Sequence, residues 1–383
     1  MHKLSVILLL VLLGLNLRPV MASIGPLTEY LLQSWHLSYS WISLLNGLPI
    51  VMMGLGALSS QWLLSRADLR RLLALALIVL GISTLSRLLN QSPASMILSS
   101  IVAGLGIALV QAFLPIVIKR QWPAQTASLM GMYVSAIMAG AAISAALAPQ
   151  ILHTSNIAWA LGGWGLLAVP TLVLLLWLVP AMPHTAAANA KVTLKPGRFC
   201  RLAGFFGLGT SGFTCMLAWL PPHFIDLGYD ATTAGLALSL LSTTEVISGL
   251  LLSQLAARSP DRRPWIMLAL LLAIAGILCL NAGAQMAWVG VILAGCGVGA
   301  LFPLSLIACM DHLEDAQSAG ILTANVQGVG YLIAGASPIL AGMLRDALHD
   351  FSMVWLGLTL IFIITMGLGW GFDPKRYALH IRR

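Results

Sequence analysis

Residues 56–70 read GALSSQWLLSRADLR, and residues 249–263 read GLLLSQLAARSPDRR. The two stretches share Gly, Leu, Ser, Gln, Asp and Arg at one constant offset, from Gly56 and Gly249 to Arg70 and Arg263. Two more segments repeat at nearly the same offset, namely Ala103-Gly104-x-Gly106 as Ala294-Gly295-x-Gly297, and Gly131 with Pro149 as Gly320 with Pro338. Because this offset is close to half of the 383 residues, the sequence predicts two homologous halves.

Composition places both halves in a membrane. Hydrophobic residues make up 59% of the chain and charged residues 8%, whereas soluble domains carry about 25% charged residues. Apolar runs of about 20 residues, the length that crosses a bilayer, occur at 4–28, 39–61, 70–89, 94–118, 126–150, 157–180, 200–222, 231–256, 264–282, 284–309, 317–344 and 350–372. We therefore expect an all-α membrane protein whose twelve transmembrane helices form two pseudo-symmetric six-helix halves, with a ligand site between the halves.

The longest polar stretch, residues 181–199, separates the sixth span from the seventh. We interpret it as a cytoplasmic linker between an N-terminal half, residues 1–180, and a C-terminal half with a short cytoplasmic tail, residues 200–383. With both termini in the cytoplasm, 17 of the 20 basic residues fall on the cytoplasmic side, and the exceptions are Arg18, Arg87 and Arg345. This excess is typical of cytoplasmic loops. The net charge of +8 therefore reflects topology and does not indicate a nucleic-acid partner.

Residues for a catalytic or metal centre are scarce. All eight histidines fall in loops or at span ends, and the five cysteines, an odd number, lie in or beside apolar spans. Such cysteines usually pack as small hydrophobic residues. We therefore expect no catalytic residue, no metal site and no cofactor, which disfavours an enzyme.

Two charged residues, Arg18 and Glu245, lie well inside predicted spans. A charge at the centre of a membrane helix costs about 2.5–3.5 kcal/mol, so each should face a partner or a wet cavity. Arg18 precedes Pro19, which has no N–H to donate and so can kink the helix. The planar guanidinium there would suit a small carboxylate or a cyanate-like anion. The alternative is a structural arginine that clamps helix ends or snorkels outward.

Glu245 lies halfway along the eighth span. Apolar surroundings would make it a candidate proton carrier, whereas a nearby Arg18 would keep it ionised. The alternative is a hydrogen-bonded structural acid.

Single polar side chains in other spans are weaker candidates for a cavity wall. Gln327 and Tyr331 are four residues apart in the eleventh span and therefore share a helix face. Asn46, Gln111 and Tyr133 stand in the second, fourth and fifth spans. Each could instead tie helices together through hydrogen bonds.

Short motifs along nearly the whole chain are Leu15-Asn16-Leu17-Arg18-Pro19 with Gly25-Pro26, Leu114-Pro115-Ile116-Val117-Ile118-Lys119-Arg120, Ala218-Trp219-Leu220-Pro221, Phe302-Pro303-Leu304 and Gln327-Gly328-Val329-Gly330-Tyr331. In these motifs the chain resembles the major facilitator superfamily, and within it the cyanate permease and nitroimidazole transporter family. The resemblance implies a monomer in the bacterial inner membrane, with spans 1, 4, 7 and 10 lining a cavity. It places Arg18, Gln111 and Trp219 near the cargo, where Trp219 could stack on a flat solute. A tryptophan near a membrane interface is otherwise an anchor.

We expect a secondary active transporter that moves a small anion or a compact polar solute, cyanate-like or nitroimidazole-like, by alternating access. Its partners would be this solute, the lipid bilayer and, through Glu245, protons. The alternative is a broad-specificity drug and proton exporter with an aromatic cavity indifferent to Arg18. The fifth span disfavours the exporter, because it reads Ala139-Gly140-Ala141-Ala142 and lacks the Gly-Pro element that resembles drug antiporters.

Overall fold

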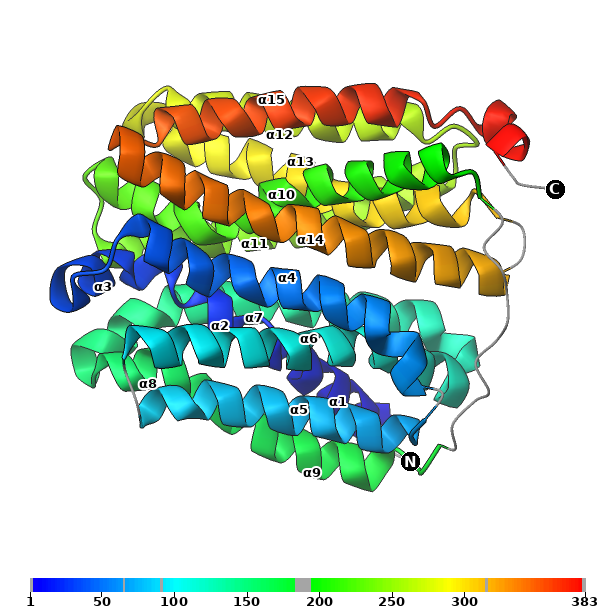
Figure 1. Ribbon diagram of the computed structural model, residues 1–383, viewed down its shortest axis with the longest axis horizontal. Coiled ribbons are helices and arrows are strands. Elements are labelled where there is room, and N and C mark those ends of the chain that lie inside the picture. Colours follow the sequence, from blue (N-terminus) through cyan, green and yellow to red (C-terminus); the bar gives the residue numbers. More distant parts are fainter. Residues whose placement is uncertain (1–2, 65, 90–91, 183–193, 314–315, 381–383) are drawn as a thin grey trace.

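The computed structural model describes residues 3–64, 66–89, 92–182, 194–313 and 316–380. These residues form helices and no β-strand. Among them, twelve helical segments are long and apolar enough to cross a membrane, which confirms the predicted number of spans. The long helices run along the longest axis of the molecule (Figure 1). The chain is therefore the all-α bundle that composition predicts.

The first six spans are formed by α1 (Lys3–Asn16), α2 (Pro19–Ala22), η1 (Gly25–Leu27), α3 (Thr28–Trp35), α4 (Tyr39–Leu64), α5 (Leu69–Leu85), η2 (Ser86–Leu88), α6 (Pro93–Gln121), η3 (Pro123–Gln125), α7 (Thr126–Thr154), α8 (Ile157–Gly162), η4 (Gly163–Leu167) and α9 (Ala168–Leu178). The last six are formed by α10 (Pro196–Asp226), α11 (Ala231–Ala257), α12 (Arg263–Asn281), α13 (Ala284–Met310), α14 (Ala316–Leu348) and α15 (Ser352–Trp370), followed by η5 (Pro374–His380).

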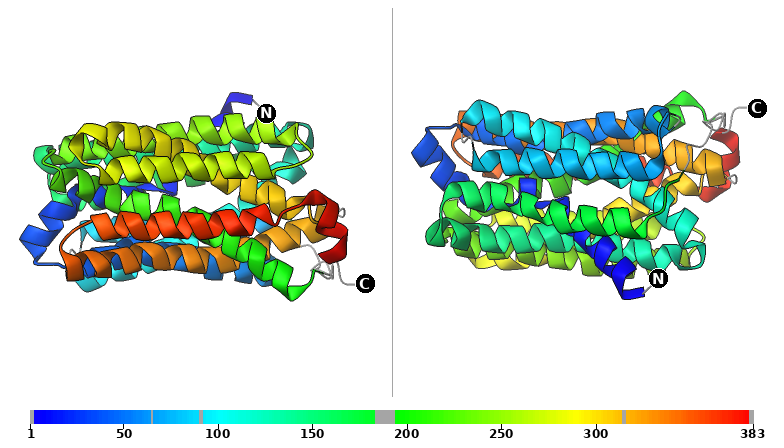
Figure 2. Two further views of the ribbon diagram at one scale, coloured as in Figure 1. Left: turned by 90° about the horizontal axis from the view of Figure 1, so that it is seen from above. Right: turned by 90° about the horizontal axis from the view of Figure 1, so that it is seen from below.

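The two sets of helices form two halves. Helices α10–α15 lie above α1–α9 in Figure 1, and α4 and α14 run side by side along the boundary. Elsewhere along it α7 packs against α11. Both halves extend along the same axis (Figure 2). We call these helix pairs the α4/α14 seam and the α7/α11 seam. The end of the bundle with the two chain termini is the terminus end, and the opposite end, with α3, is the far end.

The sequence repeat relates the two seams. Residues 56–70 run from α4 into α5, and residues 249–263 run from α11 into α12. Gly131 of α7 repeats as Gly320 of α14. Helix α4 therefore corresponds to α11, and α7 corresponds to α14. Each seam thus pairs one helix of the α4/α11 type with one of the α7/α14 type.

Two repeated carboxylates also make similar hydrogen bonds at helix starts in both halves. Asp68 accepts a hydrogen bond of 3.0 Å from the backbone N–H of Arg71 at the start of α5. Asp261 accepts one of 3.0 Å from the backbone N–H of Arg263 at the start of α12. A carboxylate at this position stabilises a helix start, because the first N–H groups have no partner within the helix.

The α4/α14 seam is built on glycines. A Cβ placed on Gly54 would lie 2.7 Å from the carbonyl oxygen of Gly328, and one on Gly47 would lie 2.7 Å from that of Gly335. These spacings are too short for any side chain, so the two backbones touch directly. Small residues at membrane helix contacts allow this close approach.

Several predicted span boundaries differ from the structure, including those of the first and seventh spans. The first span, predicted as 4–28, continues to Trp35, because the chain resumes helix after each break instead of leaving the bundle. The seventh span, predicted as 200–222, runs from Pro196 to Asp226 through Pro221 and Pro222. Most of the predicted linker, 181–199, falls on residues 183–193, which lie outside the described residues.

Candidate functional site

The first membrane span is broken beside Arg18, as the proline predicts. Helix α1 ends at Asn16, and α2 begins at Pro19. The carbonyl of Arg18 accepts hydrogen bonds from the N–H groups of Met21, at 3.0 Å, and Ala22, at 2.9 Å. Arg18 therefore stands at the start of a new turn, where its side chain can leave the direction set by α1.

Arg18 is buried, with 6% of its surface exposed, and lies against the other half. Its guanidinium carbon is 4.9 Å from the ring centroid of Phe213, on α10. Its Nε is buried without a partner, and none of the described residues accepts a hydrogen bond from this guanidinium. A desolvated cation over an aromatic ring gains about 2 kcal/mol, whereas a buried charge normally needs an ionic or hydrogen-bonding partner. Arg18 is therefore a cation with unused donors.

Glu245 is the complementary group in the second half. It is 4% exposed, and neither carboxylate oxygen has a hydrogen-bond partner within the described chain. Its backbone is fixed, because Gly299 of α13 packs directly on it. Arg18 acts on Glu245 electrostatically, yet the two do not form an ion pair within 4.0 Å. The two halves thus present a guanidinium and a carboxyl group that remain apart.

Two tyrosines complete this group. Tyr133 of α7 and Tyr331 of α14 are both buried and both lie near Arg18. The Tyr133 hydroxyl is buried without a hydrogen-bond partner among the described residues. The Tyr331 ring packs edge-on against Phe206, with centroids 5.3 Å apart. We call Arg18, Tyr133, Phe213, Glu245 and Tyr331 the central cluster, which contains a cation, a carboxyl group, two hydroxyls and an aromatic wall.

Other candidates from the sequence lie in different surroundings. Asn46 is buried, donates to the carbonyl of Ile42 at 3.3 Å and keeps its side-chain oxygen unpartnered within the described chain. Gln111 on α6 and Gln327 on α14 are half-buried. Asn16, close to Arg18 in sequence, donates to Thr171 of α9 at 2.9 Å and so joins helices of one half.

Trp219 lies in an aromatic group near the far end. It is fully buried, and its indole N–H donates to the carbonyl of Pro338 at 3.0 Å. Its ring centroid is 5.8 Å from that of Tyr39 and 5.9 Å from that of Phe351. These rings, from both halves, fill the space between α4, α10 and α14.

Hydrogen bonds tie the halves together at this far end. Asp346, on α14, accepts hydrogen bonds from the backbone N–H groups of Tyr39, at 3.0 Å, and Ser40, at 2.8 Å. The Ser40 hydroxyl donates to the same carboxylate at 2.5 Å. Asp346 thus caps the N-terminus of α4 from the opposite half. We call this contact the far-end latch.

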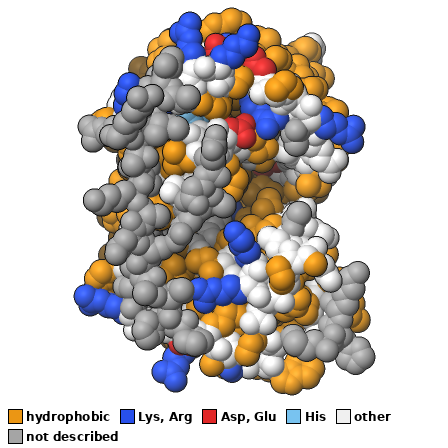
Figure 3. Space-filling model, turned by 90° about the vertical axis from the view of Figure 1, so that its right-hand side faces the viewer, with side chains coloured by type: hydrophobic (Ala, Val, Ile, Leu, Met, Phe, Trp, Pro, Cys, Tyr) orange, Lys and Arg blue, Asp and Glu red, His pale blue; other side chains and the backbone are white. Residues whose placement is uncertain are grey.

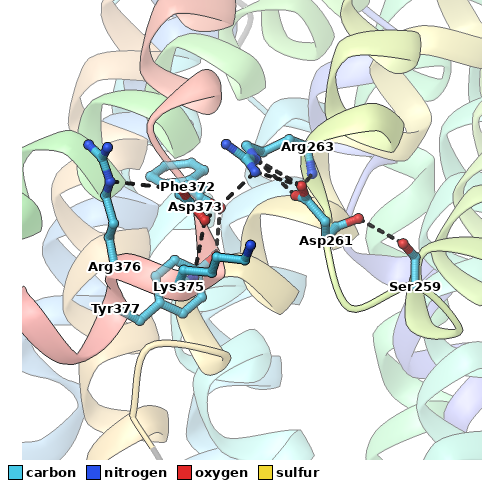
Figure 4. Close-up of polar contacts among 8 residues, drawn as sticks. All are labelled: Ser259, Asp261, Arg263, Phe372, Asp373, Lys375, Arg376 and Tyr377. Atoms are coloured by element: carbon cyan, nitrogen blue, oxygen red, sulfur yellow. Dashed lines mark hydrogen bonds and ion pairs between the residues drawn. The ribbon is translucent and has the colours of Figure 1, made fainter.

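The terminus end differs. The face on which the chain ends is hollowed between the two halves, with Lys and Arg side chains beside the hollow (Figure 3). Figure 4 shows ion pairs that stay within the second half, where Arg263 binds Asp261 at 2.7 Å and approaches Asp373 at 3.7 Å. Burial raises the pKa of Tyr377 to about 12, and its hydroxyl donates to the carbonyl of Phe372 at 3.1 Å.

Within the described residues, no three His, Cys, Asp or Glu side chains are placed to hold a metal ion. Among the described residues, the central cluster brings a buried cation and a buried carboxyl group from opposite halves near each other without a direct ion pair.

Comparison with known proteins agrees with this architecture. The sequence model of the Major Facilitator Superfamily matches residues 5–335. The chain belongs to this superfamily. As a superfamily member it is a multi-pass membrane protein of a transporter class, and the resemblance predicted from the sequence motifs is confirmed.

Two curated relatives of this superfamily member span almost the whole chain. It is 34% identical over 380 residues to the cyanate transport protein CynX of Escherichia coli (strain K12), which covers 97% of this chain and 98% of the relative. It is 27% identical over 379 residues to the 2-nitroimidazole transporter of Escherichia coli (strain K12), covering 96% and 95%.

Solved structures of other superfamily members share the fold. A D-xylose–proton symporter superposes with a TM-score of 0.78 at 18% identity, covering 97% of this chain and 98% of that one. A bacterial homologue of the human lysosomal transporter Spinster superposes with a TM-score of 0.77 at 15% identity, covering 99% and 97%. At these identities the likeness concerns the fold alone, which is the predicted bundle of two six-helix halves.

The sequence did not single out three residues that make contacts described here or below, namely Phe213, Asp346 and Arg87. Phe213 is one of many apolar residues in its span, so nothing marks it as the ring beneath Arg18. Asp346, near the end of a span, resembles an ordinary solvated acid. Arg87 stands at the end of its span, as the sequence predicts, and the structure adds that its side chain is 1% exposed. Its position at the end of an otherwise apolar span was the available signal.

Proposed function

We propose that this protein is a secondary active transporter that binds a small anion at Arg18 and carries it across the membrane by alternating access. The observation that carries the proposal is a buried guanidinium for which the described residues provide no hydrogen-bond acceptor. Such a group is costly when empty. A bound anion would supply the missing acceptors, and the planar fork of donors suits a bidentate anion.

The central cluster also limits the kind of solute. Tyr133 and Tyr331 bring hydroxyl groups beside Arg18, while Phe213 offers a flat apolar face. A compact solute with one anionic end, cyanate-like, or a small polar ring, nitroimidazole-like, would use these groups together. The named cargoes of the two relatives, cyanate and 2-nitroimidazole, have this character and support the proposal.

The proposed topology places both termini in the cytoplasm of a bacterium, with the protein acting as a monomer in the inner membrane. The basic residues of the terminus end support this orientation, because cytoplasmic loops carry an excess of Lys and Arg. The hollow in Figure 3 would then open to the cytoplasm. Residues 1–180 and 200–383 would act as two rocking units joined by 181–199.

Glu245 is the proposed proton carrier. Its carboxyl oxygens have no hydrogen-bond partner within the described chain, and Arg18 acts on it electrostatically from the other half. An anion bound at Arg18 would weaken the attraction between Arg18 and a charged Glu245, which favours proton uptake by Glu245. Anion and proton would then move together.

The first test replaces the proposed receptor. Arg18→Ala should abolish cyanate binding, and Arg18→Lys should weaken it by about 10- to 100-fold, because an ammonium loses a charged hydrogen bond of about 1.5–3 kcal/mol. Binding is measured as the rise in melting temperature of the purified protein across a panel of small anions and drug-like solutes.

Arg376→Gln is the control, because Arg376 is an exposed cation outside the central cluster. Normal anion transport by Arg18→Ala would contradict the proposal. If the panel stabilises the protein with drug-like solutes alone, regardless of Arg18, the protein is a broad-specificity exporter.

The second test concerns proton coupling. Glu245→Gln keeps the side-chain shape but cannot titrate, so uptake driven by a pH gradient should stop while solute counterflow continues. If Glu245 serves instead to neutralise Arg18, Glu245→Gln leaves an unpaired buried cation, and adding Arg18→Gln should restore stability. Unchanged gradient-driven uptake in Glu245→Gln would remove Glu245 from the mechanism.

A further inference from the structure

A second arginine is buried in the first half. Arg87, in η2, is 1% exposed and all three of its guanidinium nitrogens donate hydrogen bonds. Its Nε donates to Ser99 Oγ at 2.8 Å, and one terminal nitrogen donates to Ser100 Oγ at 2.7 Å. Both serines belong to α6, so the guanidinium is held in one plane and one orientation.

The third bond of Arg87 reaches the broken first span. Its other terminal nitrogen donates to the carbonyl oxygen of Val20 at 2.9 Å. Val20 lies in α2, two residues beyond Arg18. In a regular helix the N–H of Ile24 would bind this carbonyl, but here it donates to Met21 at 3.0 Å. Arg87 therefore donates to a backbone carbonyl that has no regular helical partner, because α2 ends at Ala22.

A hydrogen bond that only joins two helices does not require a charged donor at this place. Serine or asparagine could donate to a carbonyl, and burial of a guanidinium without a counter-ion is strongly unfavourable. Within the described residues no carboxylate pairs with Arg87. What a neutral donor lacks is the rigid fork, which fixes three acceptors on two elements at once.

We infer that Arg87 is a positioning residue for anion binding, which holds α2 so that the Arg18 guanidinium faces the central cluster. The inference rests on the proposed function of Arg18. Arg18 is the residue just before α2, and its carbonyl belongs to the first turn of that helix. A shift of α2 therefore moves the Cα of Arg18. A misplacement of about 1 Å in a positioned group can lower activity about 100-fold.

The test measures the KM and maximal rate of cyanate counterflow for the full chain in proteoliposomes, together with the melting temperature without ligand. Arg87→Gln should raise KM by roughly tenfold with little change in maximal rate per folded protein. Arg87→Lys, which keeps the charge but not the fork, should fall between Arg87→Gln and the unaltered protein. A residue that only stabilises the fold would lower the melting temperature and leave KM unchanged.

A matched control is available in the second half. Arg201 donates to the carbonyls of Leu368, at 2.9 Å, and Gly367, at 2.8 Å, away from the central cluster. Arg201→Gln thus removes arginine-to-carbonyl bonds without touching α2, and its KM should match that of the unaltered protein.

A double-mutant cycle distinguishes a failure of the positioning role of Arg87 from a failure of the proposed function of Arg18. If Arg87 acts through Arg18, Arg87→Gln should raise KM far less in an Arg18→Lys background than alone. An equal fold-change in both backgrounds, or a KM unaffected by Arg87→Gln, would overturn the positioning role. An Arg18→Lys variant with unaltered cyanate KM would instead overturn the proposed function.

Should Arg87→Gln fail to fold, the serines provide the same test. Ser99→Ala and Ser100→Ala each remove one bond that orients the guanidinium while the cation remains. Each should raise KM by a smaller factor than Arg87→Gln would, again with loss of the effect in Arg18→Lys. Unchanged KM in both serine variants would count against the inference.

Discussion

The two ends of the boundary between the halves are held in different ways. At the far end, Asp346 of the second half binds the first turn of α4 in the first half, and aromatic rings of both halves fill the space beside it. At the terminus end, the ion pairs of Arg262 and Arg263 stay within the second half, and the surface is hollow. The described residues thus join the halves by the latch at the far end, whereas the ion pairs of Arg262 and Arg263 at the terminus end do not cross the boundary.

Removal of the far-end latch should produce the largest change in this difference between the two ends. Asp346→Ala leaves the N–H groups of Tyr39 and Ser40 without their acceptor, at a cost of about 1–3 kcal/mol in the closed state. The balance should therefore move toward an open far end by roughly 10- to 100-fold. Spin labels at the exposed positions Ser34 and Leu348, one in each half, would report a longer distance.

The control for this variant is Asp350→Ala. The Asp350 carboxylate, whose pKa is lowered by the hydrogen bond from Ser352, caps a helix of its own half. Its loss should leave the spin-label distance unchanged. A closed far end in Asp346→Ala would show that the aromatic rings, not the latch, hold the halves.

A smaller effect should follow from filling the far end of the seam. A Cβ on Gly342 would lie 2.5 Å from that of Ser43 and 2.8 Å from the carbonyl of Tyr39. Gly342→Ala therefore overpacks the closed far end by about 1–3 kcal/mol and should lengthen the same spin-label distance. Gly320→Ala on the same helix meets no atom within 4 Å and should leave the distance unchanged. Equal behaviour of the two variants would mean that the far end is not tightly packed.

The smallest effect concerns the charges at the terminus end. Hydrogen bonds from Arg263 lower the pKa of the Asp261 carboxyl, so its contribution is present above the ordinary pKa of about 3.9 and is lost as the pH falls through the lowered value. Asp261→Asn should loosen η5 by about 0.2–1 kcal/mol, since the pair is partly exposed. Amide hydrogen exchange of residues 375–377 would rise, and between pH 5 and 8 it would show no added pH dependence from this carboxyl.

Asp68→Asn is the matched variant in the first half, where the equivalent carboxylate caps α5. It should leave exchange at η5 unchanged. A shift of the far-end distance by Asp261→Asn would contradict the view that the two ends are held independently.

The fold was predictable because its determinants are local in sequence. Apolar runs give the number of spans, and Pro19 gives the break beside Arg18. A charge inside an apolar run marks Arg18 and Glu245 as exceptional wherever the helices pack. The repeat even predicts which helices are equivalent, since each copy carries its own glycines and capping carboxylate.

The composition of the central cluster was not predictable in the same way. Tyr133 and Tyr331 stand out as polar residues in apolar spans, but their common relation to Arg18 arises from packing between halves. The span containing Arg87 does not reveal whether its side chain faces lipid, water or protein, and the structure places it against α6. The role of Asp346 depends on a neighbour more than 300 residues away, for which a single sequence has no signal.

The glycine contacts of the α4/α14 seam bear on how the protein responds to temperature. Where Gly47 meets Gly335 and Gly54 meets Gly328, backbone lies against backbone, and the four glycines add no side chain to the apolar surface buried there. The heat-capacity change of a transition grows with the apolar surface it exposes to water. Movement along this seam should therefore carry a smaller heat-capacity change than movement along a seam of larger side chains. The free-energy difference between its arrangements should accordingly curve less with temperature.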